Sequence, residues 1–83
     1  MEKAIEEGFK KFSSLVKNPG LFVDEDGAYY FIGVGNVNCK ENSRIVEAVL
    51  DEVYKYTDEA NVTVLIVPES VYGEVTAKLK RLK

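Results

Sequence analysis

The chain of 83 residues contains no histidine, no tryptophan and no glutamine, and its only cysteine is Cys39. Without histidine, the usual Cys–His pair that activates a thiol nucleophile cannot form. A single cysteine also excludes an internal disulfide, and it leaves too few ligands for a zinc site. The sequence therefore predicts no metal and no cofactor. Any acid–base chemistry would fall to carboxylates, lysine, tyrosine or Cys39.

Long hydrophobic runs and an excess of positive charge are absent as well. The longest mostly apolar run, residues 62–67, is far shorter than the ~20 residues that a membrane-spanning helix needs. The acidic and only briefly apolar start of the chain is not typical of a signal peptide. The formal net charge of −3 disfavours binding to a nucleic-acid backbone. With a lone thiol that suits a reducing compartment, these absences predict a cytoplasmic protein with no membrane or nucleic-acid partner.

The remaining composition fits a small globular domain. Hydrophobic residues make up 46% of the chain and charged residues 30%, which argues against disorder. We expect one compact domain over residues 1–83, and homo-oligomerisation is open because a domain of this size buries a limited core. The absence of glutamine and the abundance of lysine and glutamate favour a thermophilic source, although five asparagines count against it.

Hydrophobic periodicity predicts the element order α-β-β-α-β-α. Helical stripes cover residues 2–17, a segment that ends near residue 57, and residues 71–82; strand-like segments cover residues 21–24, 28–35 and 62–67. The predicted fold class is α/β, with α+β as the alternative. It consists of a small three-stranded sheet with helices packed on it and with its second and third strands parallel.

Two of the predicted strands are apolar on both faces. For residues 28–35 this pattern indicates a central strand, and the nearly continuous apolar run 62–67 is typical of a buried strand. The turn 24–27 ends in Gly27, where we expect a positive φ. A three-stranded sheet has two edges, and one of them could pair with a second copy of the chain.

The carboxyl edge of the two parallel strands is the candidate ligand site. In open α/β sheets ligands bind at this edge, and the N–H groups at the starts of the following helices favour anions. Lys40 and Arg44 add positive charge that suits phosphate or carboxylate. The candidate ligand-binding residues are Gly33, Gly35, Asn36, Asn38, Lys40, Asn42, Ser43, Arg44, Glu69 and Ser70.

A structural interpretation of the same residues stays open. Gly33 and Gly35 can allow a helix to pack closely on the sheet. Asn38, with Glu41 three residues later, resembles a capping box, and Ser70 is a fair N-cap for the last helix.

Three functions follow from these observations. The favoured hypothesis is a protein-interaction module without catalysis that self-associates through a sheet edge or a helix face. The alternative is a binder of a small anion, such as phosphate, a nucleotide or a carboxylate, at the candidate residues. An enzyme built on Cys39 or Glu69 is the least favoured, because no spacing pairs groups for catalysis, and no catalytic residue is assigned.

Overall fold

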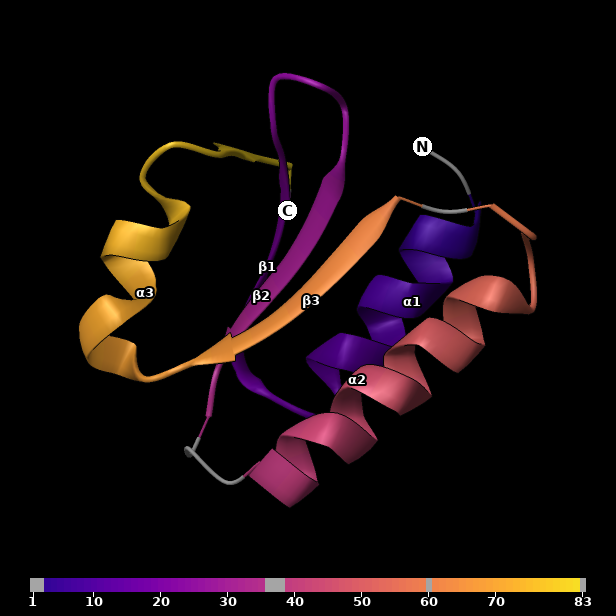
Figure 1. Cartoon of the computed structure of the whole chain (residues 1–83), viewed down its shortest axis with the longest axis horizontal. Coiled ribbons are helices and arrows are strands. Elements are labelled where there is room, and N and C mark those ends of the chain that lie inside the picture. The colour runs from indigo at the N-terminus through magenta and orange to yellow at the C-terminus, as the bar shows by residue number, and fades with distance from the viewer. Residues whose placement is uncertain (1–2, 36–38, 60, 83) are drawn as a thin grey trace.

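A computed structural model of the chain describes residues 3–35, 39–59 and 61–82. Figure 1 shows the helices and strands that these residues form. The helices are α1 (Lys3–Ser13), α2 (Cys39–Tyr54) and α3 (Glu69–Thr76), and the strands are β1 (Lys17–Val23), β2 (Tyr29–Val34), β3 (Val62–Val67) and β4 (Lys80–Arg81). The predicted α/β class and element order are confirmed, but the sheet has four strands rather than three.

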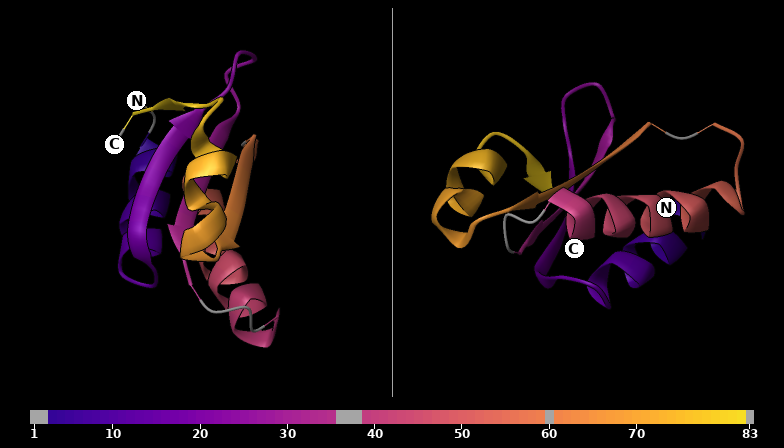
Figure 2. Two further views of the ribbon diagram at one scale, coloured as in Figure 1. Left: turned by 90° about the vertical axis from the view of Figure 1, so that its left-hand side faces the viewer. Right: turned by 60° about the horizontal axis from the view of Figure 1, so that its bottom comes forward.

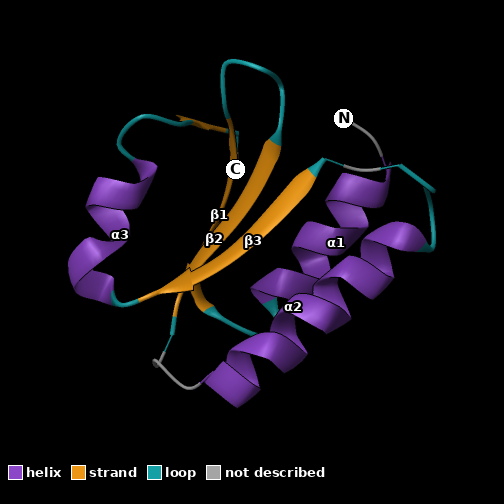
Figure 3. Ribbon diagram, viewed as in Figure 1, coloured by secondary structure: helices purple, strands orange, loops and turns teal. Residues whose placement is uncertain are grey.

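The strands lie in the order β3-β2-β1-β4. β1 and β2 form an antiparallel hairpin, whereas β2 and β3 run parallel, from Tyr29 opposite Val62 to Val34 opposite Val67. α2 supplies the crossover connection that a parallel pair requires (Figure 3). The predicted central place of β2 and its parallel pairing with β3 are confirmed, so both strands end at the same edge of the sheet.

One face of the sheet is covered by the two longer helices, with α1 on the side of β1 and α2 on the side of β3 (Figure 2). The rings of Phe9 and Phe12 on α1 each lie 5.8 Å, between centroids, from the ring of Phe31 on β2. Val49 and Val53 of α2 are fully buried in the same core. Because each fully buried large apolar side chain contributes roughly 1.5–3 kcal/mol, this face supplies most of the stability of the fold.

Close packing of α1 on α2 depends on Gly8. This glycine is buried, and a Cβ atom at its position would collide with the Val53 side chain and lie 3.1 Å from the ring of Phe31. The two helices and the sheet therefore meet at a point where even a methyl group has no room.

The opposite face of the sheet is covered by α3, and less completely. The Tyr72 ring packs edge-on against that of Phe22, with centroids 6.5 Å apart, but no residue of α3 is buried. A Cβ atom on Gly20 of β1 would lie 2.8 Å from the Tyr72 hydroxyl oxygen, so glycine lets α3 approach the sheet. The same hydroxyl is buried and has no hydrogen-bond partner among the described residues.

Asp24 organises the hairpin turn between β1 and β2. One of its carboxylate oxygens accepts hydrogen bonds from the backbone N–H groups of Asp26 and Ala28, at 2.9 and 3.0 Å; the other accepts one from the Tyr30 hydroxyl at 3.0 Å. The bond from Ala28, followed by those from Tyr30 and Asp26, holds the pKa of Asp24 below its ordinary value. The expected positive φ of Gly27 is confirmed at 85°.

The first helix is shorter than predicted, because α1 ends at Ser13 rather than at Lys17. The hydroxyls of Ser13 and Ser14 donate to backbone carbonyls one turn back, at 2.8 and 2.7 Å, as is common at a helix end. Pro19 disfavours helical backbone at the residue before it, and Asn18 takes a φ of 47°. Lys17 already belongs to β1, which therefore starts earlier than the predicted strand.

The predicted cap of the last helix is wrong. α3 begins at Glu69 directly after Pro68, whose backbone is extended, and no side chain caps the helix. Ser70 therefore lies inside the first turn. The Pro68 carbonyl accepts a hydrogen bond from the Val71 N–H at 3.1 Å, which satisfies one N–H group of the first turn without a side-chain cap. The predicted Asn38 cap lies outside the described residues, and α2 ends at Tyr54, close to the predicted end.

The end of the chain forms a fourth strand where the sequence predicted more helix. α3 stops at Thr76, and β4 pairs antiparallel with β1. The Leu82 N–H donates to the Leu21 carbonyl at 2.7 Å, and the Arg81 guanidinium lies 5.6 Å from the ring centroid of Phe22. These contacts join parts of the chain that are far apart in sequence, so local periodicity does not reveal them.

β3 has the predicted bounds but a different environment. It lies at the edge of the sheet, none of its residues is fully buried, and Thr63 is exposed. The prediction of a buried strand is therefore wrong. The apolar pattern on both faces of β3 fits a strand whose faces are covered, but it does not indicate whether a further strand pairs with its outer edge.

Candidate functional site

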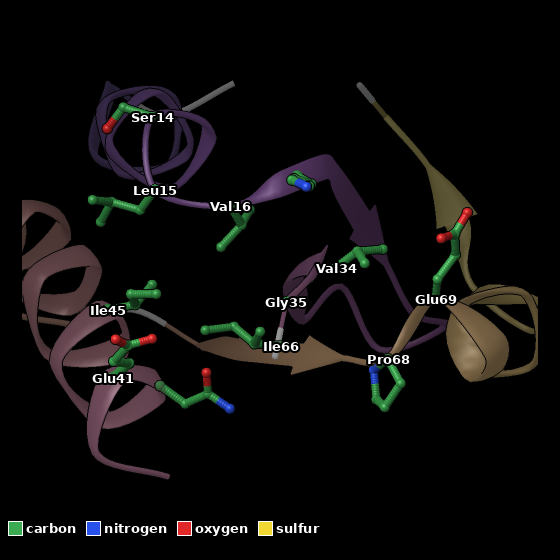
Figure 4. Close-up of a pocket in the computed structure, with 12 residues that line it drawn as sticks. Ser14, Leu15, Val16, Val34, Gly35, Glu41, Ile45, Ile66, Pro68 and Glu69 are labelled. Carbon is green, nitrogen blue, oxygen red and sulfur yellow. The ribbon is translucent and has the colours of Figure 1, made fainter. Parts of the chain in front are cut away.

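A groove of about 680 Å³ opens where β2 and β3 end (Figure 4). The parallel pairing brings the ends of both strands together there, and the segment after α1 closes one side. The apolar lining is Leu15, Val16, Val34, Ile45, Ile66 and Pro68, and the polar lining is Ser14, Lys17, Glu41, Asn42 and Glu69, with Gly35 at the end of β2.

Three of the ten predicted ligand-binding residues, Gly35, Asn42 and Glu69, line this groove. Gly33 does not, because it is buried beneath the side chain of Val16 and serves close packing. For Gly33 the structural interpretation therefore holds.

The other predicted residues are not brought into the groove or are not described. The side chains of Lys40, Ser43 and Arg44 on α2 and of Ser70 on α3 are exposed and do not belong to its described lining. Asn36 and Asn38 lie outside the described residues. The groove thus gathers only part of the described candidate residues.

The charge of the groove does not favour an anion. Its described lining carries two carboxylates, on Glu41 and Glu69, and one ammonium group, on Lys17. The predicted cations Lys40 and Arg44 are not part of that lining. Sites for phosphate or carboxylate depend on convergent cations or N–H groups, and this arrangement supplies little positive charge.

Sequence reasoning missed the segment from Ser14 to Lys17 as part of the groove. It was assigned to the first helix, whose shorter extent in the structure frees the segment to line the site. The available signal was the pair Ser13 and Ser14, because serine hydroxyls compete for backbone groups and disfavour a helix interior.

The outer edge of β3 is the second candidate surface. The N–H of Tyr29 donates to the carbonyl of Asn61 at 2.9 Å, and that of Gly35 donates to the carbonyl of Val67 at 3.2 Å. Both bonds show that odd-numbered residues of this segment turn their peptide groups toward β2. Because peptide groups alternate in direction along a strand, the N–H and C=O groups that point away from the sheet belong to Val62, Val64 and Ile66.

The two edges of the sheet differ in charge and in length. At the edge formed by β4, the strand has only two residues, Lys80 and Arg81, and short charged strands of this kind discourage further pairing. At the opposite edge, β3 has six residues with no charge, no proline and no register irregularity. Among the described residues, none of the devices that usually protect an edge is found on β3.

The described residues include no group of three or more potential metal ligands. No helix among them has the length and apolar character required to cross a bilayer.

No protein-family model, curated protein or solved structure matches the chain. The functional assignment therefore rests on the groove and the β3 edge themselves.

Proposed function

We propose that this chain is a protein-interaction module that binds by adding a strand of its partner to the open edge of β3. The observation that carries the proposal is the contrast between the two edges: six uncharged residues on β3 against a two-residue basic strand on β4. A protein that must avoid edge pairing protects its long edges, and this chain protects only the short one.

Strand addition uses features that β3 presents. Its three outward N–H and three outward C=O groups, on Val62, Val64 and Ile66, offer main-chain hydrogen bonds to an incoming strand. Five of its six side chains are half-buried, so a partner would remove further apolar surface from water on both faces of the sheet.

Amide hydrogen exchange of the full chain tests this proposal. The probe is a synthetic peptide with the sequence of residues 61–67 and two added lysines at each end for solubility. At millimolar peptide or at rising protein concentration, we expect the outward amides of Val62, Val64 and Ile66 to exchange at least about tenfold more slowly. The amides of Thr63 and Leu65, which face β2, serve as internal references.

Val64→Pro removes an outward N–H while every bond to β2 stays available, because proline is tolerated on the open side of an edge strand. This variant should lose the protection, and Thr63→Val should keep it. Unchanged exchange of all three outward amides, at every concentration of peptide and protein, would contradict the proposal.

A further inference from the structure

We infer that the strand received by β3 is the β3 of a second copy, paired antiparallel about a two-fold axis that passes through the pair of Val64 residues. The inference rests on the proposed function, since it names the partner of the same edge. It commits to a single register, which the direction of the peptide groups determines.

The register follows from the three outward residues. When Val64 lies opposite Val64 of the second copy, Val62 lies opposite Ile66, and all the outward groups of β3 find partners. Each of these antiparallel pairs exchanges two N–H···O=C bonds. A shift of two residues toward the end of the strand places Val62 opposite Pro68, which has no N–H to donate. A shift of two residues toward the start of the strand leaves Ile66 opposite a position before β3, so only the Val64-centred register pairs all three outward residues within β3.

The same axis sets which faces meet. Residues directly opposite in an antiparallel pair share a face, so an axis perpendicular to the sheet leaves the α1–α2 layers of both copies on one side. On the other face, Thr63 of one copy lies opposite Leu65 of the other. The sheet of each copy thus continues into that of its partner with the same layering.

α2 places an apolar strip beside this seam. It lies on the β3 side of the helical layer, whereas α1 lies on the β1 side (Figure 2). Ile45 lines the groove together with Leu15, which follows α1, so this flank of α2 faces the α1 side. Val46 and Leu50 lie about 100° and 140° around the helix from Ile45, and both are only half-buried.

Pairing of the two β3 strands brings the α2 helices of both copies toward each other through these flanks. The interface would then have a hydrogen-bonded layer in the sheet and an apolar layer above it. This combination explains why β3 and the neighbouring side of α2 are both apolar, although neither is fully covered within one copy.

Disulfide trapping tests the register. In a Cys39→Ser background, Val64→Cys places two thiols on Cα atoms about 5.5 Å apart, within the range that a disulfide spans. Val62→Cys is the matched control, because its two copies are offset by four residues, about 13 Å, along the strands. With a mild oxidant we expect a covalent dimer from Val64→Cys and none from Val62→Cys. The reverse result, or no covalent dimer from either, would overturn the register.

Sedimentation equilibrium tests whether the strand paired with β3 comes from a second copy of the chain. Thr63 is exposed in one copy, so Thr63→Lys leaves the isolated chain intact but places a charge beside Leu65 of the second copy. We expect its dimer dissociation constant to rise at least about tenfold, and that of Thr63→Val to stay within about twofold.

The outcomes separate the inference from the proposed function. A chain that stays monomeric at 0.5 mM, roughly the highest concentration at which sedimentation is practical, overturns the second-copy inference. If the strand peptide then still protects the outward amides, the proposed function stands with a different partner. If it does not, both are overturned.

Discussion

Replacing Gly8 with alanine tests the claim that α1, α2 and β2 meet without room for a methyl group. The added Cβ would collide with Val53 and lie 3.1 Å from the Phe31 ring. Val53 is fully buried and β-branched, with one strongly preferred χ1 rotamer on a helix, so it cannot turn aside. Phe31 is held by Phe9 and Phe12, so relief requires α1 to move away from the core.

Two opposing terms decide the size of the effect. Forcing a methyl group into a packed core costs about 1–3 kcal/mol, whereas alanine gains about 1 kcal/mol over glycine in a helix interior. Gly73 is the matched control, since it lies in the middle of α3 and a Cβ there meets nothing within 4 Å. We therefore expect Gly73→Ala to gain about 1 kcal/mol and Gly8→Ala to lose up to about 2 kcal/mol.

The difference between these two variants isolates the packing cost, because the gain in helix propensity is common to both. Urea unfolding followed by far-UV circular dichroism, with a shared m-value, measures it. A difference of 1–3 kcal/mol corresponds to roughly 4–24 °C between the two melting temperatures. Equal stabilisation by the two alanines would refute the described packing of α1 against α2.

Three further predictions concern pH, the groove and a buried hydroxyl. Because the pKa of Asp24 is lowered in the folded state, its stabilisation is present above about pH 4 and is lost as the pH falls through the folded-state value. Melting curves from pH 7 to pH 2 should therefore fall less steeply for Asp24→Asn than for the natural chain, and parallel curves would contradict this. The groove should not bind phosphate, because Lys17 is the one cation in its described lining. Phosphate at a hundred times the Kd of a site would raise the free energy of unfolding by about 2.7 kcal/mol. A rise in melting temperature on the order of that effect in 10 mM phosphate would therefore favour the anion site instead. Tyr72→Phe should raise stability by about 1 kcal/mol in urea unfolding, because it removes a buried hydroxyl that has no partner among the described residues; a loss of stability would show that the hydroxyl is satisfied.

Local signals predicted much of the fold. The bounds of β3 were correct because a run rich in β-branched residues is closed by Pro68, and the turn at Gly27 was correct because few residues other than glycine take a positive φ there. The parallel pairing of β2 and β3 followed from two doubly apolar strands joined by a helix.

The errors share a physical cause, which is that distant segments competed with local preference. The periodic pattern at the end of the chain fits a helix, but backbone bonding and side-chain contacts with β1 place Arg81 beside Phe22. The predicted site residues are gathered only in part at the groove for the same reason. Lys40 and Arg44 lie on α2, which contributes other residues to the groove. Their own side chains are exposed outside its described lining, because the packing of the apolar face of α2 determines the direction of each side chain.

The sequence by itself determined the order of the elements as far as α3, the hairpin turn and the meeting of two strand ends at one edge, because these depend on spacing, glycine and proline within short windows. Only the tertiary structure decided that β3 has no neighbour on its outer side and that β4 closes the opposite edge with charge. A strand's own residues set its pattern, but the hydrogen-bonding groups it leaves open depend on which other strands the chain brings beside it.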